Sequence, residues 1–238
     1  MRLDWLTARP VAHRGLHDAS AGIIENTPSA FAAAVAGNYA IECDLQISAD
    51  GEAMVHHDGA LGRLTEGSGR LDAMTAAELK RVPFRATADR MITVGELCDL
   101  AAGKVTLVIE MKSRFDGDRR VVARAAEVLS GYSGPAVLMS FDPAQIVALR
   151  AIAPRLRRGL VAEKRPSGSK GALAYARNAL AAQPQFLAYS VKDLPAAAPL
   201  SARAILRMPL LTWTVRTADD RARAARWADQ MIFEGFRP

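Results

Sequence analysis

Short apolar segments alternate with alanine-rich helical segments along the whole chain, and this rhythm constrains the fold more than any other feature. Runs such as VTLVIEMK and PAVLMSF are apolar almost throughout, which favours strands that are buried on both faces of a parallel sheet. We expect eight strands, at Pro10–Arg14, Ala40–Asp44, Thr106–Lys112, Ala136–Phe141, Arg157–Ala162, Phe186–Val191, Leu210–Val215 and Gln230–Glu234.

Helices are expected between most of these strands, at Thr27–Ala36, Thr93–Ala102, Arg119–Ser130, Pro143–Ala153, Lys170–Ala181 and Ala218–Ala228. Such alternation implies parallel pairing with helical crossovers. Eight strands favour a closed barrel over an open sheet, and 238 residues are close to the roughly 250 that such a barrel needs. We therefore expect an α/β fold, a (β/α)8 TIM barrel that forms a single domain over residues 1–238.

Residues 46–90 interrupt this rhythm. Too few residues separate LQIS from EAMV for a helix, and Asp50-Gly51 between them is a strong turn dipeptide. The segment is therefore predicted to form a β-hairpin after the second strand. A polar, irregular excursion is expected to follow on the top face of the barrel, with a short helix near Ala76–Arg81.

The amino-acid composition limits the kinds of molecule that the protein is expected to bind. The net charge is +6, but the basic residues are spread over the helices, and no Lys/Arg block is interleaved with aromatic residues. Nucleic acid is therefore not expected as a partner, and the charge reflects either a solvated surface or attraction of an anionic substrate. Two cysteines, no signal-like apolar run and no membrane-length segment predict a cytoplasmic protein without a membrane anchor.

Acidic side chains gather where two of the expected strands end. The second strand ends in Glu42-Cys43-Asp44 and the third in Glu110-Met111-Lys112. Side chains alternate along a strand, so Glu42 and Asp44 point to one side and Cys43 to the other. Barrel strands present their carboxyl ends at one face, where three carboxylates repel one another unless a cation joins them. Oxygen ligands of this kind suit Mg²⁺ or Ca²⁺, so a divalent metal is the expected cofactor.

Two histidines are expected beside these carboxylates. His13 ends the first strand, and a hairpin turn centred on Asp50-Gly51 places His57 directly opposite Asp44, with His56 facing away. Histidine can donate and accept protons near neutral pH, so His13 and His57 are candidates for general acid and base.

Four further residues are candidates for substrate binding in the same region. Arg14 and Lys112 could hold a phosphate group, Arg14 through its bidentate fork. Glu25 and Asn26 follow His13 closely, and the segment Glu25–Pro28 is either a helix cap, with Thr27 as N-cap, or part of the site.

Several motifs, in this order and spacing, resemble the glycerophosphodiester phosphodiesterase family in its short bacterial cytoplasmic form. They are His13-Arg14-Gly15, Glu25-Asn26-Thr27, Glu42-x-Asp44 and His57-Asp58, with weaker matches at Ile109–Lys112, Ser140-Phe141 and Trp213–Val215. The chain departs from the family in MIFEGFRP, where members often carry a Thr-Asp pair, and in ITV at Ile92–Val94. Both departures concern the rim of the barrel.

That family is a metal-dependent (β/α)8 barrel of lipid and glycerol metabolism that cleaves glycerophosphodiesters to glycerol 3-phosphate and an alcohol. The resemblance implies that the metal ligands are Glu42, Asp44 and Glu110 and that the acid/base pair is His13 and His57. It further implies that Arg14 and Lys112 contact the phosphate and that Trp213 lines the substrate cleft.

Two other functions stay open, namely a phospholipase-type phosphodiesterase that acts on intact or lyso phospholipid and a non-catalytic barrel that binds a phosphoglycerol ligand. The sequence also leaves open the choice between Mg²⁺ and Ca²⁺, the alcohol headgroup, and which histidine is the acid and which the base. It does not decide whether water attacks the phosphorus directly or a glycerol hydroxyl attacks first to give a cyclic intermediate. A small phosphodiester is the expected partner, and the oligomeric state is not predicted.

Overall fold

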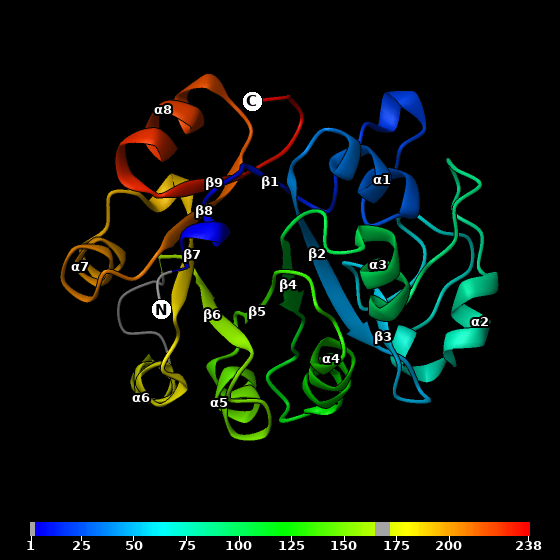
Figure 1. Ribbon diagram of the computed structural model, residues 1–238. Helices are drawn as coiled ribbons and strands as arrows, with labels where there is room; N and C mark the ends of the chain where they lie inside the picture. Colours follow the sequence, from blue (N-terminus) through cyan, green and yellow to red (C-terminus); the bar gives the residue numbers. More distant parts are fainter. Residues whose placement is uncertain (1–2, 165–171) are drawn as a thin grey trace.

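Eight parallel strands close into a barrel in the computed structural model, which describes residues 3–164 and 172–238 (Figure 1). The barrel strands are β1 (Val11–Ala12), β2 (Ala40–Ile47), β4 (Leu107–Met111), β5 (Ala136–Ser140), β6 (Arg157–Ala162), β7 (Phe186–Ser190), β8 (Leu210–Val215) and β9 (Gln230–Phe233). Each pairs with its neighbour in this order, and β1 pairs with both β2 and β9, which closes the ring. The predicted (β/α)8 barrel is therefore confirmed.

Helices lie between the strands and surround the barrel (Figure 1). They are α1 (Pro28–Ala36), α3 (Val94–Ala101), α4 (Arg120–Ser130), α5 (Pro143–Ile152), α6 (Ala172–Ala182), α7 (Ala197–Leu206) and α8 (Ala218–Trp227), with short 3₁₀ turns η1 (Asp4–Leu6), η2 (Ala19–Ala21), η3 (Leu71–Ala73) and η4 (Val191–Asp193). The start of the predicted helix Lys170–Ala181 lies outside the described residues. None of the described helices combines the length and the apolar character needed to cross a membrane.

Helix α7 was not predicted, and its sequence contains prolines at and before its start. Pro195 precedes it and Pro199 lies in its first turn. The first N–H groups of a helix have no partner within the helix, so a proline in this turn removes no hydrogen bond.

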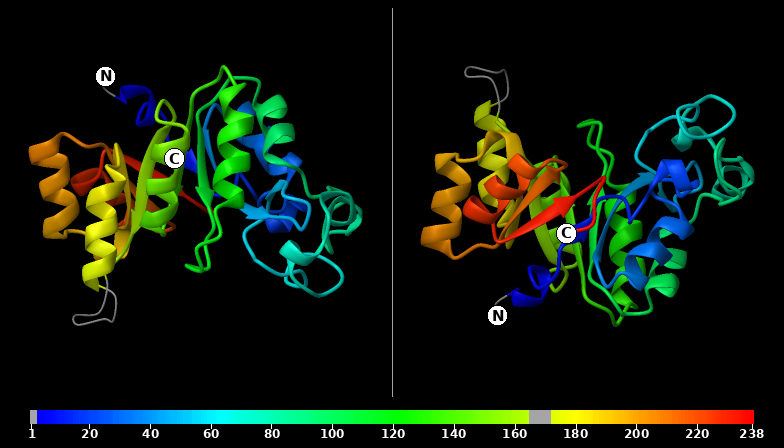
Figure 2. Two further views of the ribbon diagram at one scale, coloured as in Figure 1. Left: turned by 90° about the horizontal axis from the view of Figure 1, so that it is seen from below. Right: turned by 90° about the horizontal axis from the view of Figure 1, so that it is seen from above.

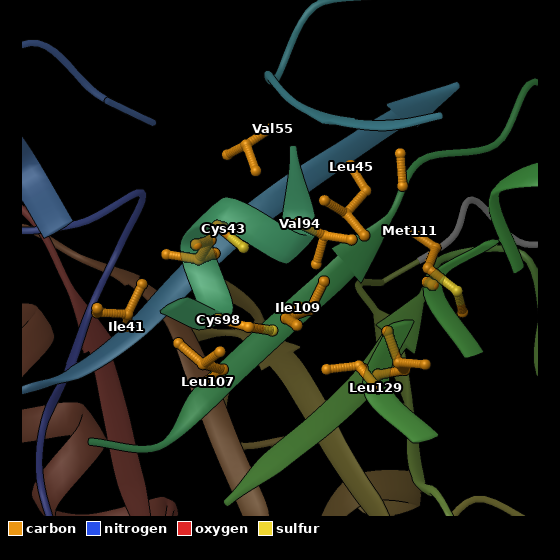
Figure 3. Close-up of a cluster of buried hydrophobic side chains, with 14 of the residues drawn as sticks. Ile41, Cys43, Leu45, Val55, Val94, Cys98, Leu107, Ile109, Met111 and Leu129 are labelled. Carbon is orange, nitrogen blue, oxygen red and sulfur yellow. The ribbon is translucent and has the colours of Figure 1, made fainter. Parts of the chain in front are cut away.

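Side chains of β2 and β4 alternate between the helices and the inside of the barrel. The outward residues form a buried cluster with α3 and α4, made of Ile41, Cys43, Leu45, Leu107, Ile109, Met111, Val94, Cys98 and Leu129 (Figure 3). Full burial of one aliphatic side chain contributes about 1.5–3 kcal/mol, so this cluster strongly fixes the strand register. The alternate residues, including Glu42, Asp44 and Glu110, consequently face inward.

The bottom of the barrel interior is apolar. Val11, Ala40, Val108 and other inward side chains pack there with Leu3 and Leu6, which come from the segment at η1. This packing fills one end of the barrel and leaves the charged residues at the other end.

The predicted hairpin after the second strand is present, but its register differs from the prediction. Strand β3 (Ala53–Val55) pairs with β2 so that Ile47 lies opposite Ala53. The Ser48 N–H donates to the Glu52 carbonyl, so three residues form the loop, with Gly51 at φ 83°. A three-residue loop with glycine in the left-handed region is a common hairpin connection. The prediction of a two-residue turn was therefore wrong by one residue.

The excursion that follows β3 has a small core of its own, made of Ile24, Met54, Leu71, Leu79, Phe84 and Met91. It projects from one side of the barrel (Figure 2). Helix α2 (Ala76–Arg81) lies where it was predicted, because Thr75 and Glu78 form a reciprocal capping box at its start.

Candidate active site

The turn after β1 places two functional groups at the top of the barrel. Arg14 and Gly15 both have positive φ, 56° and 81°. A Cβ atom on Gly15 would lie 2.9 Å from the backbone of Ala30, so only glycine fits there. This turn directs the Arg14 N–H to Oε2 of Glu42, at 2.9 Å. The glycine of the HRG motif thus has a structural role in shaping the site.

Three carboxylates converge at the ends of β2 and β4, as the strand alternation predicted. Asp44 and Glu110 are register partners, and Glu42 lies two residues before Asp44 on the same side. One oxygen from each carboxylate lies within 4.8 Å of the others, and all three residues are buried. Lys112 Nζ lies 2.8 Å from Asp44 Oδ1 and 2.7 Å from Glu110 Oε1.

The charges of these groups are only partly balanced by the protein. Burial opposes ionisation of Asp44, but Lys112 and Arg14 outweigh it and hold its pKa well below the usual range. Burial raises the pKa of Glu110 to about 7. Burial, followed by the charges of Asp44 and Glu110, raises the pKa of Glu42 well above its usual value. A divalent cation would allow all three carboxylates to ionise, and their hard oxygen donors fit Mg²⁺ or Ca²⁺.

His13 is held by a carboxylate from the last strand. Its Nδ1 lies 2.7 Å from Oε2 of Glu234, and its Nε2 lies 3.9 Å from Oε2 of Glu42. Arg216 Nη2 contacts the same Glu234 oxygen at 2.9 Å. Burial raises the pKa of Glu234, but hydrogen bonds from His13 and Arg216 bring it down to about 2. Burial lowers the pKa of His13, so a neutral imidazole donates its Nδ1–H to an ionised carboxylate at neutral pH.

His57 has a similar arrangement. Its Nδ1 lies 2.8 Å from Oδ1 of Asp58, whose other oxygen accepts from Nε of Arg63. His56 is buried, and its Nδ1 bonds to the backbone of Asp58. The hairpin register places His56, and not His57 as predicted, opposite Asp44. Strand β3 ends at Val55, however, so the side chains of His56 and His57 no longer follow the alternation of a strand.

Glu25 and Asn26 support the site from behind and do not line its cavity. Glu25 accepts hydrogen bonds from Arg14 and from Arg63, both at 2.7 Å. Asn26 Nδ2 donates to Asp44 Oδ2 at 2.9 Å. Arg63 therefore connects the excursion to the HRG turn through Glu25.

Seven of the predicted site residues border a cavity of about 310 Å³ with two different sides, whereas Asp44, Glu25 and Asn26 do not line it. One side is charged and consists of His13, Arg14, Glu42, His57, Glu110 and Lys112. The other is mainly apolar and consists of Met139, Phe141, Val161, Trp213, Thr214 and Ile232, with Arg216 at its edge. The Trp213 indole N–H donates to the Ala188 carbonyl, and the Phe141 ring packs edge-on against Trp213 at 5.4 Å. Such a cavity can hold a small anion on one side and a carbon chain on the other.

Sequence reasoning missed Glu234, Arg216, Arg63 and Phe141 as members of the site. Glu234 could have been suspected from the sequence, since it falls in the segment that departs from the family pattern. Nothing in the sequence marks Arg63 as a site residue, because arginines are common in polar surface segments.

The chain matches the model of the glycerophosphoryl diester phosphodiesterase family over residues 13–236. It is similar to the glycerophosphodiester phosphodiesterase of Caldanaerobacter subterraneus subsp. tengcongensis, with 30% identity over 162 residues that cover 63% of this chain and 65% of that protein. The match thus spans slightly less than two thirds of that relative.

Solved structures share the barrel. A phosphodiesterase of Oleispira antarctica, in complex with the product sn-glycerol-3-phosphate, superposes with a TM-score of 0.81 at 21% identity, over 96% of this chain and 94% of that chain. A glycerophosphodiester phosphodiesterase of Thermotoga maritima gives a TM-score of 0.74 at 22% identity, over 94% of each chain. Because the family model covers nearly the whole sequence, this protein belongs to the glycerophosphoryl diester phosphodiesterase family.

Proposed function

We propose that this protein hydrolyses a glycerophosphodiester to glycerol 3-phosphate and an alcohol, with one divalent metal ion and two histidines. One observation carries the proposal: His13, His57, Glu42 and Glu110 border the same small cavity, opposite an apolar side that contains Trp213. Asp44 completes the carboxylate cluster with Glu42 and Glu110. The activity named for the Caldanaerobacter relative and the product bound to the Oleispira structure support it.

Glu42, Asp44 and Glu110 would hold the metal, Mg²⁺ or Ca²⁺. When bound, the ion would supply positive charge that neutralises phosphoryl oxygens. Arg14 and Lys112 border the same cavity and would bind the remaining phosphoryl oxygens. The glycerol carbons would pack against Trp213 and Phe141.

The two histidines are oriented for proton transfer. Each imidazole donates its Nδ1–H to a carboxylate, Glu234 for His13 and Asp58 for His57, which leaves Nε2 free to exchange a proton with substrate. One histidine removes a proton from the nucleophile as its oxygen bonds to phosphorus. The bond from phosphorus to the alcohol oxygen breaks, and the other histidine, which enters the step protonated on both nitrogens, gives that oxygen its Nε2 proton. If water is the nucleophile, glycerol 3-phosphate forms directly; if a glycerol hydroxyl is the nucleophile, water then opens the cyclic phosphate to the same product.

The test is release of glycerol 3-phosphate from glycerophosphocholine by the purified protein, before and after EDTA, with Mg²⁺ or Ca²⁺ added back. We expect release that EDTA abolishes and either ion restores. Phosphatidylglycerol is assayed in parallel, because faster cleavage of this intact lipid would support the phospholipase alternative instead. Binding of glycerol 3-phosphate without turnover of any diester would support the non-catalytic alternative.

A further inference from the structure

A second cavity of about 480 Å³ adjoins the active-site cavity. It lies between the excursion, which contributes Ala60 and Arg70, and the loop after β4, which contributes Arg114 and Asp116. The excursion lies beside β2 and β3, as Figure 1 shows. We call this second cavity the outer cleft. The active-site cavity and the outer cleft have two lining residues in common, His57 and Lys112.

Ion pairs hold the two walls of the outer cleft together. Asp72 of the excursion pairs with Arg70 at 2.7 Å and also with Arg114 from the opposite wall. Arg114 pairs in addition with Asp116 at 2.9 Å. Exposed pairs of this kind add little stability. The Asp72 carboxylate nevertheless connects the two walls of the cleft.

The lining of the outer cleft is polar, and its cations are paired with carboxylates. Three cations, Lys112, Arg70 and Arg114, face it together with two carboxylates, Asp116 and Asp118. Gln46 adds an amide whose nitrogen donates to the His57 carbonyl at 2.8 Å, which leaves its oxygen to accept from a ligand. No Phe, Tyr or Trp ring is among the described residues that line it. Hydroxyl groups suit such a lining because they can both donate and accept hydrogen bonds, whereas a quaternary ammonium group can do neither and would find no aromatic ring here.

Another opening beside the active site has the opposite chemistry. This cavity of about 320 Å³ is lined by Phe115, Phe141 and Glu163 together with Glu110 and Lys112. Aromatic rings and a carboxylate would favour a quaternary ammonium group. Neither of the two site histidines lines it, whereas His57 lines the outer cleft.

We infer that the outer cleft binds the leaving alcohol and that it selects uncharged, hydroxylated alcohols such as glycerol or inositol. The inference rests on the proposed function. His57 lines both cavities, so a substrate that occupies the two would place its scissile bond beside this residue. When the bond from phosphorus to the alcohol oxygen breaks, that oxygen takes the Nε2 proton of a His57 that is protonated on both nitrogens, and Nε2 of His13 accepts the proton of the nucleophile.

The test compares kcat/KM of the metal-loaded protein for three diesters of glycerol 3-phosphate, with inositol, choline and methanol as the alcohol. Wild type is expected to prefer the inositol ester over the choline ester by about tenfold, the effect of roughly 1.4 kcal/mol of transition-state binding. Ala60→Trp fills the outer cleft and should lower the ratio of inositol to methyl ester about tenfold. Phe115→Trp, the matched control in the other opening, should leave that ratio unchanged.

A charge variant keeps the test independent of any folding defect in Ala60→Trp. Arg70→Glu should shift the ratio of choline to inositol ester at least about fivefold towards choline, because it makes the lining acidic. A wild-type preference for choline, or a ratio that responds to Phe115→Trp and not to Ala60→Trp, overturns the inference while the proposed function stands. Failure to release glycerol 3-phosphate from any of the three esters overturns both.

Discussion

Nδ1 of His13 lies 2.7 Å from Oε2 of Glu234, although 221 positions separate the two residues in the chain. Closure of the barrel brings them together, because Ala12 of β1 is the register partner of Phe233 of β9 and each residue follows directly. Donation of Nδ1–H to Glu234 fixes the imidazole with Nε2 towards Glu42. Glu234 is thus a positioning residue for His13.

Glu234→Gln should lower kcat roughly 10- to 100-fold with little change in KM, since a neutral amide cannot stabilise the protonated imidazole that forms during proton transfer. Glu234→Asp should recover part of the loss. Steady-state kinetics on glycerophosphocholine measure both, with Asp99→Asn on the outside of the barrel as the control. Full kcat in Glu234→Gln would show that His13 needs no carboxylate partner.

The same carboxylate should make stability depend on pH. The pKa of Glu234 is about 2 in the folded protein and 4.5 is its ordinary value. A depressed pKa stabilises the fold above the ordinary value, and this contribution disappears as pH falls through the range from 4.5 to 2. Wild type should therefore have a higher Tm than Glu234→Gln at pH 6, and the difference should shrink as the pH is lowered from 4.5. A difference that is constant over this range would contradict the assignment.

The two histidines should respond differently to the leaving group. His57→Ala and His13→Ala should each slow hydrolysis of glycerophosphoglycerol by roughly 10²- to 10⁴-fold, the usual effect of losing a positioned acid or base. The p-nitrophenyl ester of glycerol 3-phosphate needs no protonation of its leaving oxygen. His57→Ala should therefore recover most of its rate on this ester, and His13→Ala should not.

His56→Gln is the neighbouring comparison, and it should slow both esters far less than His57→Ala does, because His56 does not line the cavity. Recovery by His13→Ala in place of His57→Ala would reverse the roles of the two histidines.

The barrel could be predicted from sequence because its periodic signal is local. Ile41, Cys43 and Leu45 reveal one face of a strand and Glu42 and Asp44 the other, which was enough to place the carboxylates together. The hairpin register could not be predicted, because two- and three-residue loops share the same Asp-Gly dipeptide and differ by one residue in pairing.

Contacts between site residues and residues far away in the chain could not be predicted from the sequence either. Arg63 reaches Glu25 across 38 positions, and Glu234 reaches His13 across 221. Neither contact produces a periodic or local pattern. Only the closed barrel and the folded excursion bring these residues together.

The effect of Glu42→Gln on thermal stability should change sign when a divalent metal binds to the carboxylate cluster. Without a divalent ion, Glu42 is a buried acid beside two others, and burial and its neighbours disfavour its ionised form. Glu42→Gln replaces this acid with a neutral amide that cannot ionise, so the metal-free variant should be at least as stable as metal-free wild type, by Tm in EDTA. With Mg²⁺ or Ca²⁺ at about 100 times Kd, wild type should gain about 2.7 kcal/mol from binding to the folded state. The variant, with one ligand fewer, should gain much less, so the order of the two Tm values should reverse.

Asp44→Asn and Glu110→Gln should also lose the metal-dependent gain in Tm. Calorimetric titration should show weaker metal binding in all three variants. An equal rise in Tm on metal addition for wild type and the three variants would place the ion elsewhere in the protein.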